Sequence, residues 1–83
     1  MFLMGAATAL YSIDRQPVTS TSIASIGYDA RTRMLDVEFR SGAIYRYLQV
    51  PNAVASGFKN APSKGGYFVR HIRGKFAFRQ IRR

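Results

Sequence analysis

A stretch of alternating residues near the middle of the chain most limits the folds that this sequence can adopt. The apolar residues Leu35, Val37 and Phe39 alternate with charged ones, which is the period-two pattern of a β-strand with one buried face. A run rich in β-branched and aromatic residues follows over residues 44–50, and such residues favour strands. The sequence therefore predicts an antiparallel β-hairpin over residues 35–50.

The turn near Gly42 decides which side chains of the hairpin meet. A three-residue loop ending there would place this glycine in the left-handed conformation of a bulged hairpin and would pair Val37 with Tyr45. Leu35 would then face Tyr47, so both tyrosines would share the apolar face, whereas a two-residue loop would turn them toward the acidic face. Two-residue turns prefer Asn or Asp before Gly, or Gly first. Because serine precedes Gly42, we predict the three-residue loop.

A three-stranded antiparallel meander is expected. A first strand is predicted over residues 22–29, and a polar turn at residues 29–33 leads from it into the hairpin. Gly27 is a candidate β-bulge within that strand. Residues 14–21, with Pro17 near their centre, are expected to form a linker.

Two short helices should cover one face of this sheet. Pro51 suits the first position of the first helix, because its φ is fixed and its missing N–H would be unpaired there. Val54 and Phe58 are four residues apart and would share the buried face of this helix. Pro62 should end it.

The second helix is predicted to begin after Ser63, a good N-cap residue. Phe68 and Ile72 would form its buried face, and Gly74 is a natural C-terminal stop. Residues 75–83 are expected to form either a short closing strand or an extended segment that packs on the domain.

The predicted fold class is therefore α+β, with a small three-stranded meander and two short helices packed on one face, in a single domain over residues 18–83. Residues 1–17 would be an apolar tail and linker. Residues 1–13 carry no charged side chain, but a membrane span takes about 20 apolar residues, so no membrane contact is expected. They could instead add a strand or a self-association contact, which leaves a homo-oligomer open. The chain has no cysteine, which fits a cytoplasmic protein.

The distribution of charge indicates an anionic partner. The chain carries 13 Lys and Arg residues against four Asp and Glu residues, for a net charge of +9. All four acids precede residue 39, whereas ten of the 13 basic residues lie from Arg40 onward. The predominantly positive electrostatic potential of this part of the chain attracts nucleic acid, nucleotides or an acidic protein surface. A solvated basic surface without a partner is the competing interpretation.

No catalytic, metal or cofactor site is predicted. Nucleophilic catalysis needs a nucleophile, a base and an orienting group together, and the single histidine, His71, stands between basic residues without a motif. Metal binding lacks both cysteine and a histidine cluster. Asp36 and Glu38 should share one strand face and form ion pairs with basic strand residues.

The best local candidate for phosphate binding is the segment from Ser63 to Tyr67. A helix N-terminus offers unpaired amides and a positive dipole end. Gly65 and Gly66 would leave those amides accessible, and Lys64 would add charge. The competing interpretation is an ordinary capped helix start with permissive glycines.

A wider basic surface is predicted on the second helix and the segment after it. Arg70 and Arg73 are three apart and would face away from the buried side of the helix. Cations interleaved with tyrosines are typical of proteins that bind single-stranded nucleic acid. We predict phosphate contacts from Lys64, Arg70, Arg73, Lys75 and Arg79, with Arg46, Tyr45 and Tyr67 as auxiliary contacts.

The chain carries, in this order, Ile26-Gly-Tyr-Asp29, Leu35, Val37, Phe39, Gly42, Tyr45, Tyr47, Val50-Pro51, Ala61, Ser63, Gly65, Tyr67-Phe68, Ile72-Arg73, Phe76 and Ile81. The order and spacing of these residues resemble the KTSC domain, a module found at the C-terminus of some lysyl-tRNA synthetases and as stand-alone bacterial and phage proteins. Val69 departs from the family pattern, in which a polar residue, often Asn, follows the aromatic pair. The resemblance implies a small soluble domain for which RNA binding is proposed.

The function expected from these observations is non-catalytic binding of nucleic acid, with RNA as the favoured partner. Two alternatives stay open. The domain could be an adaptor for an acidic protein surface, in a phage-encoded modulator for example, or an oligomer that binds a small anionic nucleotide around residues 63–67.

Overall fold

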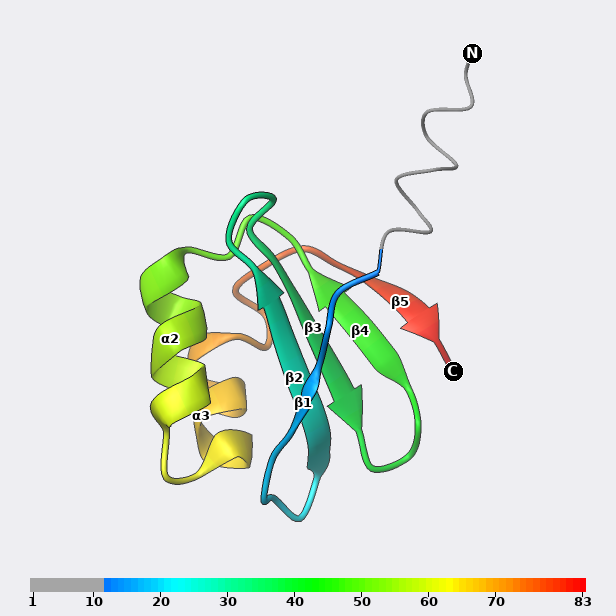
Figure 1. The fold of residues 1–83 in the computed structure, drawn as a ribbon. Coiled ribbons are helices and arrows are strands. Elements are labelled where there is room, and N and C mark those ends of the chain that lie inside the picture. The colour runs from blue at the N-terminus through cyan, green and yellow to red at the C-terminus, as the bar shows by residue number, and fades with distance from the viewer. Residues whose placement is uncertain (1–11) are drawn as a thin grey trace.

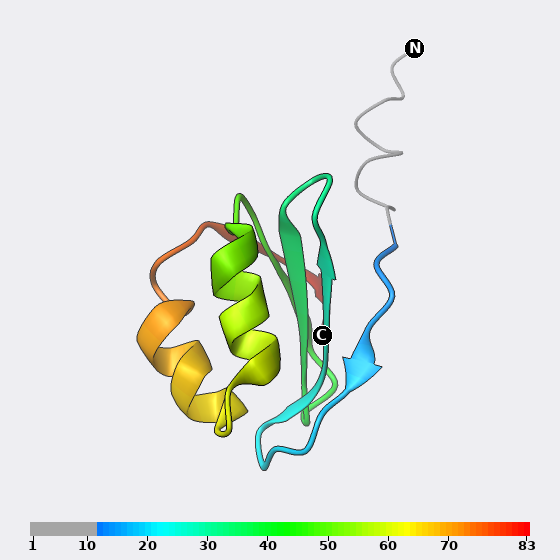
Figure 2. The same ribbon diagram turned by 60° about the vertical axis from the view of Figure 1, so that its left-hand side comes forward.

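The computed structural model describes residues 12–83 as an antiparallel sheet with two helices on one face (Figures 1 and 2). The sheet has five strands in the spatial order β1-β2-β3-β4-β5, so the predicted α+β class is confirmed and the three predicted strands are its centre. The elements are β1 (Gln16–Pro17), β2 (Ile23–Asp29), β3 (Met34–Phe39), β4 (Ile44–Tyr47), α2 (Asn52–Asn60), α3 (Lys64–His71) and β5 (Phe78–Arg82).

The hairpin of β3 and β4 has the predicted register. Leu35 pairs with Tyr47 and Val37 pairs with Tyr45. Gly42 has a φ of 99°, a left-handed conformation that glycine adopts without steric cost. The three-residue loop is therefore confirmed, and both tyrosines lie on the apolar face.

Two strands extend the predicted meander. β5 pairs with β4 and is the closing strand that the sequence left as one option. β1 was predicted to be linker, and this is wrong for Gln16 and Pro17, which pair with Ile26 and Ser25 of β2. Pro17 is tolerated because β1 is an edge strand, where a residue without an N–H costs no ladder bond on its open side.

The core lies between the sheet and the helices. Val37 and Leu35 of the sheet are fully or almost fully buried, as are Phe58 of α2 and Ile72 just after α3. Full burial of such a side chain stabilises the fold by roughly 1.5–3 kcal/mol. The amphipathic pattern of each helix is therefore confirmed.

The helix ends differ slightly from prediction. Pro51 is the N-cap of α2, with an extended ψ of 149°, and not its first helical residue. Ser63 caps α3 by accepting a hydrogen bond from the Gly66 amide at 3.1 Å, as predicted. Because α3 ends at His71, Arg73 lies in the turn after the helix and not on its surface.

The face of the sheet opposite the helices is crossed by the chain before β1. A Cβ atom on Gly27 would collide with the carbonyl oxygen of Asp14, so Gly27 permits a close backbone approach. The bulge predicted there lies instead between Ile23 and Ser25. Ile13 is buried; the other predictions for residues 1–13 fall almost entirely outside the described residues. Within residues 12–83 no helix could span a membrane.

Candidate nucleic-acid interface

An open aromatic groove of about 440 Å³ lies between the β3–β4 hairpin, β5 and the turn after α3. Tyr45 stacks on Phe78 with ring centroids 5.2 Å apart and planes 2° from parallel. Phe39 meets Tyr45 edge to face at 5.7 Å. We call this set the aromatic groove; its lining residues are Phe39, Ser41, Ala43, Tyr45, Tyr47, Phe68, Arg73, Gly74 and Phe78.

The rings of the groove differ in accessibility. Tyr47 and Phe68 are buried and form its floor, while Tyr45 is half-buried. Phe78 is 54% exposed, although it is a large apolar side chain. An exposed ring beside a cation can stack on a nucleobase, which a buried ring cannot do.

Arg73 is the one predicted phosphate contact that lines the aromatic groove. Burial raises the pKa of Tyr47 to about 12, the neighbouring Tyr45 adds to the rise, and the positive charge of Arg73 opposes it. The Arg73 guanidinium is exposed and its field reaches the groove floor. Arg73 therefore places an accessible cation beside the aromatic rings of the groove.

The remaining predicted cations are not all brought to this groove. The Arg70 guanidinium lies 3.7 Å from the position a Cβ would take on Gly66, so this side chain runs back along α3 toward its first turn. Lys75 is exposed in the turn before β5. Arg79 pairs with Arg46 across β4 and β5, which places both on the sheet face away from the helices and away from Tyr45.

Arg46, a predicted auxiliary contact, is buried, and the structure contradicts its use by a ligand. Its guanidinium forms a bidentate ion pair with Asp36, with N–O distances of 2.8 and 2.9 Å. Asp36 is fully buried and Arg46 is only 4% exposed. The ion pairs predicted for the acidic strand face are present, because Glu38 also pairs with Arg82 at 2.8 Å.

The ionised form of Glu38 is further stabilised by its neighbours on the same face. The Ser25 hydroxyl donates a hydrogen bond to Glu38 at 2.7 Å and lowers the pKa of Glu38 below its ordinary value, helped by the charges of Arg15 and Arg82 and opposed by burial. This face is therefore an internal ion-pair network and presents few free cations.

Two groups of the predicted phosphate seat at the start of α3 make internal hydrogen bonds. Lys64 donates a hydrogen bond to the Ala61 carbonyl oxygen, and Gly66 donates to Ser63. A Cβ on Gly65 would lie 3.1 Å from the Ser22 hydroxyl. These are the contacts of an ordinary capped helix start packed closely on its neighbours.

Tyr67 belongs to the contact between the helices. Its hydroxyl donates to the Val54 carbonyl oxygen at 2.8 Å, and its ring stacks on Phe58 at 5.6 Å. His71 lies beside it, with ring centroids 4.5 Å apart. Tyr67 therefore faces α2 and does not join the aromatic groove.

Phe78 is the site residue that the sequence did not identify. The sequence left a closing strand or an extended packed segment open for residues 75–83, and the place of Phe78 follows from its pairing with Tyr47 across β4 and β5. Metal binding finds no support in residues 12–83, which contain no cluster of potential ligands.

Comparison with known proteins identifies the family. The model of the KTSC domain matches residues 19–76, from the loop before β2 to the turn before β5. A crystal structure of a KTSC domain protein from Yersinia pestis is 46% identical, with a TM-score of 0.80 over 83% of this chain and 97% of that one.

The curated relatives include proteins of very different length. A lysine–tRNA ligase of Nostoc punctiforme is 44% identical over 59 residues, which are 71% of this chain and 10% of the ligase. An uncharacterised protein of Stutzerimonas stutzeri is 44% identical over 54 residues, which are 65% of this chain and 76% of that protein. The chain thus spans about a tenth of the ligase that it matches. From the matched span and the shared fold, this chain belongs to the KTSC domain family.

Proposed function

We propose that this domain binds single-stranded nucleic acid, with RNA preferred, and that it does so without catalysing a reaction. The observation that carries the proposal is the exposed Phe78, stacked on Tyr45 beside Arg73 in the aromatic groove. A base stacked on the accessible ring would gain roughly 1–3 kcal/mol. Arg73 would contact the adjoining phosphate.

The remaining basic residues would act over a longer range. Arg70 and Lys75 are exposed and flank Arg73 in sequence, so they would attract the strand and contact phosphates outside the groove. Arg46 is buried and Arg79 lies on the other face of the sheet, so neither belongs to the proposed site. The similarity to lysine–tRNA ligases, whose name gives tRNA as a substrate, supports RNA and a cytoplasmic location.

The test is binding of the purified chain to labelled single-stranded RNA, single-stranded DNA and duplex, measured by fluorescence anisotropy over a salt series. Each phosphate contact should add about −0.7 to the slope of log K against log salt for a single strand. We expect single strands to bind more tightly than duplex and RNA to bind most tightly.

Three variants locate the site. Phe78→Ala should weaken binding about 5- to 150-fold, the equivalent of the loss of one stacked base, and Arg73→Gln should reduce the salt slope by about 0.7. Arg79→Gln removes the same charge from the opposite face and is the matched control. If Arg79→Gln lowered the affinity as much as Arg73→Gln, or if Phe78→Ala bound like the unaltered chain, the groove would not be the binding site.

A further inference from the structure

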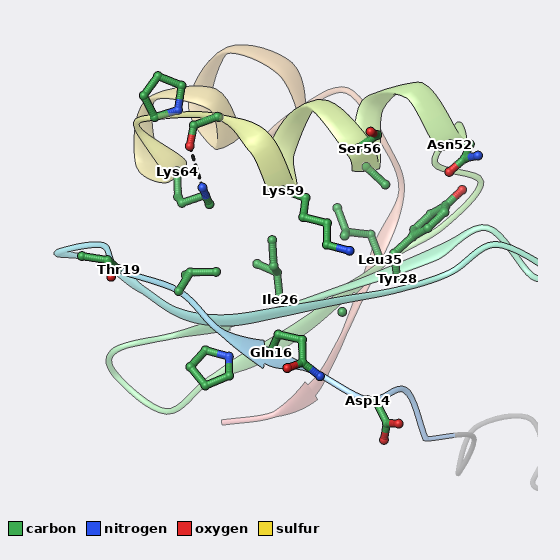
Figure 3. Close-up of a pocket in the computed structure, with 16 residues that line it drawn as sticks. Asp14, Gln16, Thr19, Ile26, Tyr28, Leu35, Asn52, Ser56, Lys59 and Lys64 are labelled. Atoms are coloured by element: carbon green, nitrogen blue, oxygen red, sulfur yellow. Dashed lines mark hydrogen bonds between the residues drawn. The ribbon is translucent and has the colours of Figure 1, made fainter.

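A second groove, larger than the aromatic one, lies under α2 at the opposite edge of the sheet, the edge formed by β1 and β2 (Figure 3). Its volume is about 870 Å³, and it is bounded by α2, by β2 and by β1 with the chain that follows β1. The aromatic groove is bounded instead by α3, β4 and β5. The two sites therefore share no lining residue and can be tested separately. We call this one the lysine groove.

The lysine groove combines an apolar floor with a polar rim. Ile26 and Leu35 of the sheet face α2 at its floor, and Val18 adds a half-buried aliphatic side chain. Gln16, Thr19, Asn52 and Ser56 are exposed along the rim. Sites for small molecules are commonly hollows of about 300–1,000 Å³ with apolar walls and a few polar groups that fix orientation.

Two cations project into this groove from the helix side. Lys59, in the last turn of α2, extends toward the sheet, and Lys64 lies at the adjoining start of α3 (Figure 3). Among residues 12–83, no hydrogen bond or ion pair engages the Lys59 ammonium group. Lys64 donates to the Ala61 carbonyl oxygen, and an ammonium group has three donors, so two remain for a ligand.

Negative charge is nearly absent from the described lining. Asp14 is its only acidic residue, and it lies on the β1 side of the sheet, away from the lysines (Figure 3). The helix side of the groove thus presents uncompensated positive charge above an aliphatic floor. A neutral apolar molecule would leave those donors unused, and a bare inorganic anion would make no use of the apolar part of the lining.

We infer that the lysine groove binds a small amphipathic anion. A carboxylate or phosphate head would be held by Lys59 and Lys64, and an aliphatic body would lie against the half-buried Val18, above the buried Ile26 and Leu35. The rim amides and hydroxyls would orient the ligand. This site is independent of the proposed nucleic-acid interface.

The test is an NMR titration of the isotope-labelled full chain with decanoate and with decyl phosphate, each below its micelle-forming concentration. We expect saturable shifts of the amide resonances of Thr19, Gly27 and Ser56 with at least one of these probes. The probe that binds more tightly identifies the preferred head group. Decanol and inorganic phosphate, which each carry half of the required chemistry, should bind more weakly. Absence of saturable shifts with both amphipathic probes would overturn the proposal.

Two variants assign the role of the groove. Lys59→Gln should weaken binding of the tighter probe by at least about tenfold, the loss of one charge-assisted hydrogen bond, whereas Lys75→Gln removes an equal charge outside the groove and should change little. Ser56→Trp, at an exposed helix position, should block the groove without unfolding the chain. Equal effects of the two lysine substitutions, or unaltered binding by Ser56→Trp, would contradict the assignment. Lys59→Gln should leave RNA affinity close to that of the unaltered chain, whereas Lys75→Gln, at a proposed phosphate contact, should weaken it and reduce the salt slope by about 0.7.

Discussion

Asp36 and Arg46 form an ion pair that is almost completely removed from water. Two charges in such a place must compensate each other, because each would otherwise lose its hydration without a replacement. The bidentate geometry, with two N–O distances below 3 Å, is the arrangement in which a guanidinium compensates a carboxylate best. The pair therefore fixes β3 against β4 on the face away from the helices.

Removal of one partner of this pair should be costly. Arg46→Met leaves the Asp36 carboxylate buried without its guanidinium, and the free energy of unfolding should fall by about 3–5 kcal/mol. The double variant Asp36→Leu with Arg46→Met replaces both charges by apolar groups and should lose much less. Urea unfolding measures both. A double variant as unstable as the single one would show that packing, and not the lone charge, sets the cost.

Tyr47 predicts a loss of stability at high pH. Burial raises the pKa of Tyr47 to about 12 in the folded chain, while an exposed tyrosine has a pKa of about 10. The unfolded chain thus releases this proton first, so the contribution is fully present below pH 10 and is lost as the pH rises to about 12. Ultraviolet absorbance of tyrosinate should show a late-titrating component that is lost in Tyr47→Phe. If Tyr47→Phe and the unaltered chain lost stability identically over this range, Tyr47 would not be its cause.

The two helices meet through a glycine and a tyrosine. Gly57 of α2 lies under the Tyr67 ring of α3, and a Cβ on Gly57 would be 3.0 Å from the ring carbon that bears the hydroxyl, with the hydroxyl oxygen closer still. The hydrogen bond from Tyr67 to Val54 and its stacking on Phe58 depend on this close approach. Gly57 is therefore a packing residue inside a helix, where glycine alone is unfavourable.

Gly57→Ala separates these two effects. Alanine improves helix propensity by about 1 kcal/mol, but overpacking against Tyr67 should cost about 1–3 kcal/mol, so we expect a net loss of stability in urea unfolding. In a Tyr67→Ala background the clash is absent, and the same substitution should stabilise the chain. A gain of stability from Gly57→Ala alone would mean that Tyr67 moves aside freely.

The elements that the sequence predicted well are those whose causes are local. The hairpin register follows from Gly42 and the residues beside it, and the start of α3 follows from the Ser63 side chain. β1 could not be predicted, because a two-residue strand containing Pro17 exists only through the edge of β2. Burial of Arg46 and exposure of Phe78 could not be predicted either. Each depends on which other segments of the chain pack against that side chain, and the local sequence does not determine this.

At the scale of the whole molecule, net charge opposes compactness. With 13 basic and four acidic residues, and two of the acids committed to ion pairs with arginines, the remaining cations repel one another over the surface. Attraction to a polyanion and self-repulsion are thus two results of the same charge distribution.

Salt should therefore stabilise this chain. Raising sodium chloride from about 0.01 M to about 0.1 M shortens the Debye length from about 30 Å to about 10 Å, which screens repulsion between distant cations more than the buried Asp36–Arg46 pair. We expect the thermal unfolding midpoint to rise. The midpoint of a double variant, Lys75→Gln with Arg83→Gln, should rise less with salt. A fall in the midpoint of the unaltered chain would show that surface ion pairs outweigh the repulsion.

The position of β5 has a consequence for the lifetime of the aromatic groove. β5 is an edge strand whose five residues are all exposed and whose ladder joins it to β4 alone, and such edges open locally while the rest of a domain stays folded. Because Phe78 belongs to β5, the groove exists only in the fraction of molecules with this strand docked, and the apparent affinity is reduced by that fraction. A bound strand of RNA would raise the fraction of molecules with β5 docked. Hydrogen–deuterium exchange should therefore slow across residues 78–82 on binding, while β2 and β3 keep their exchange rates.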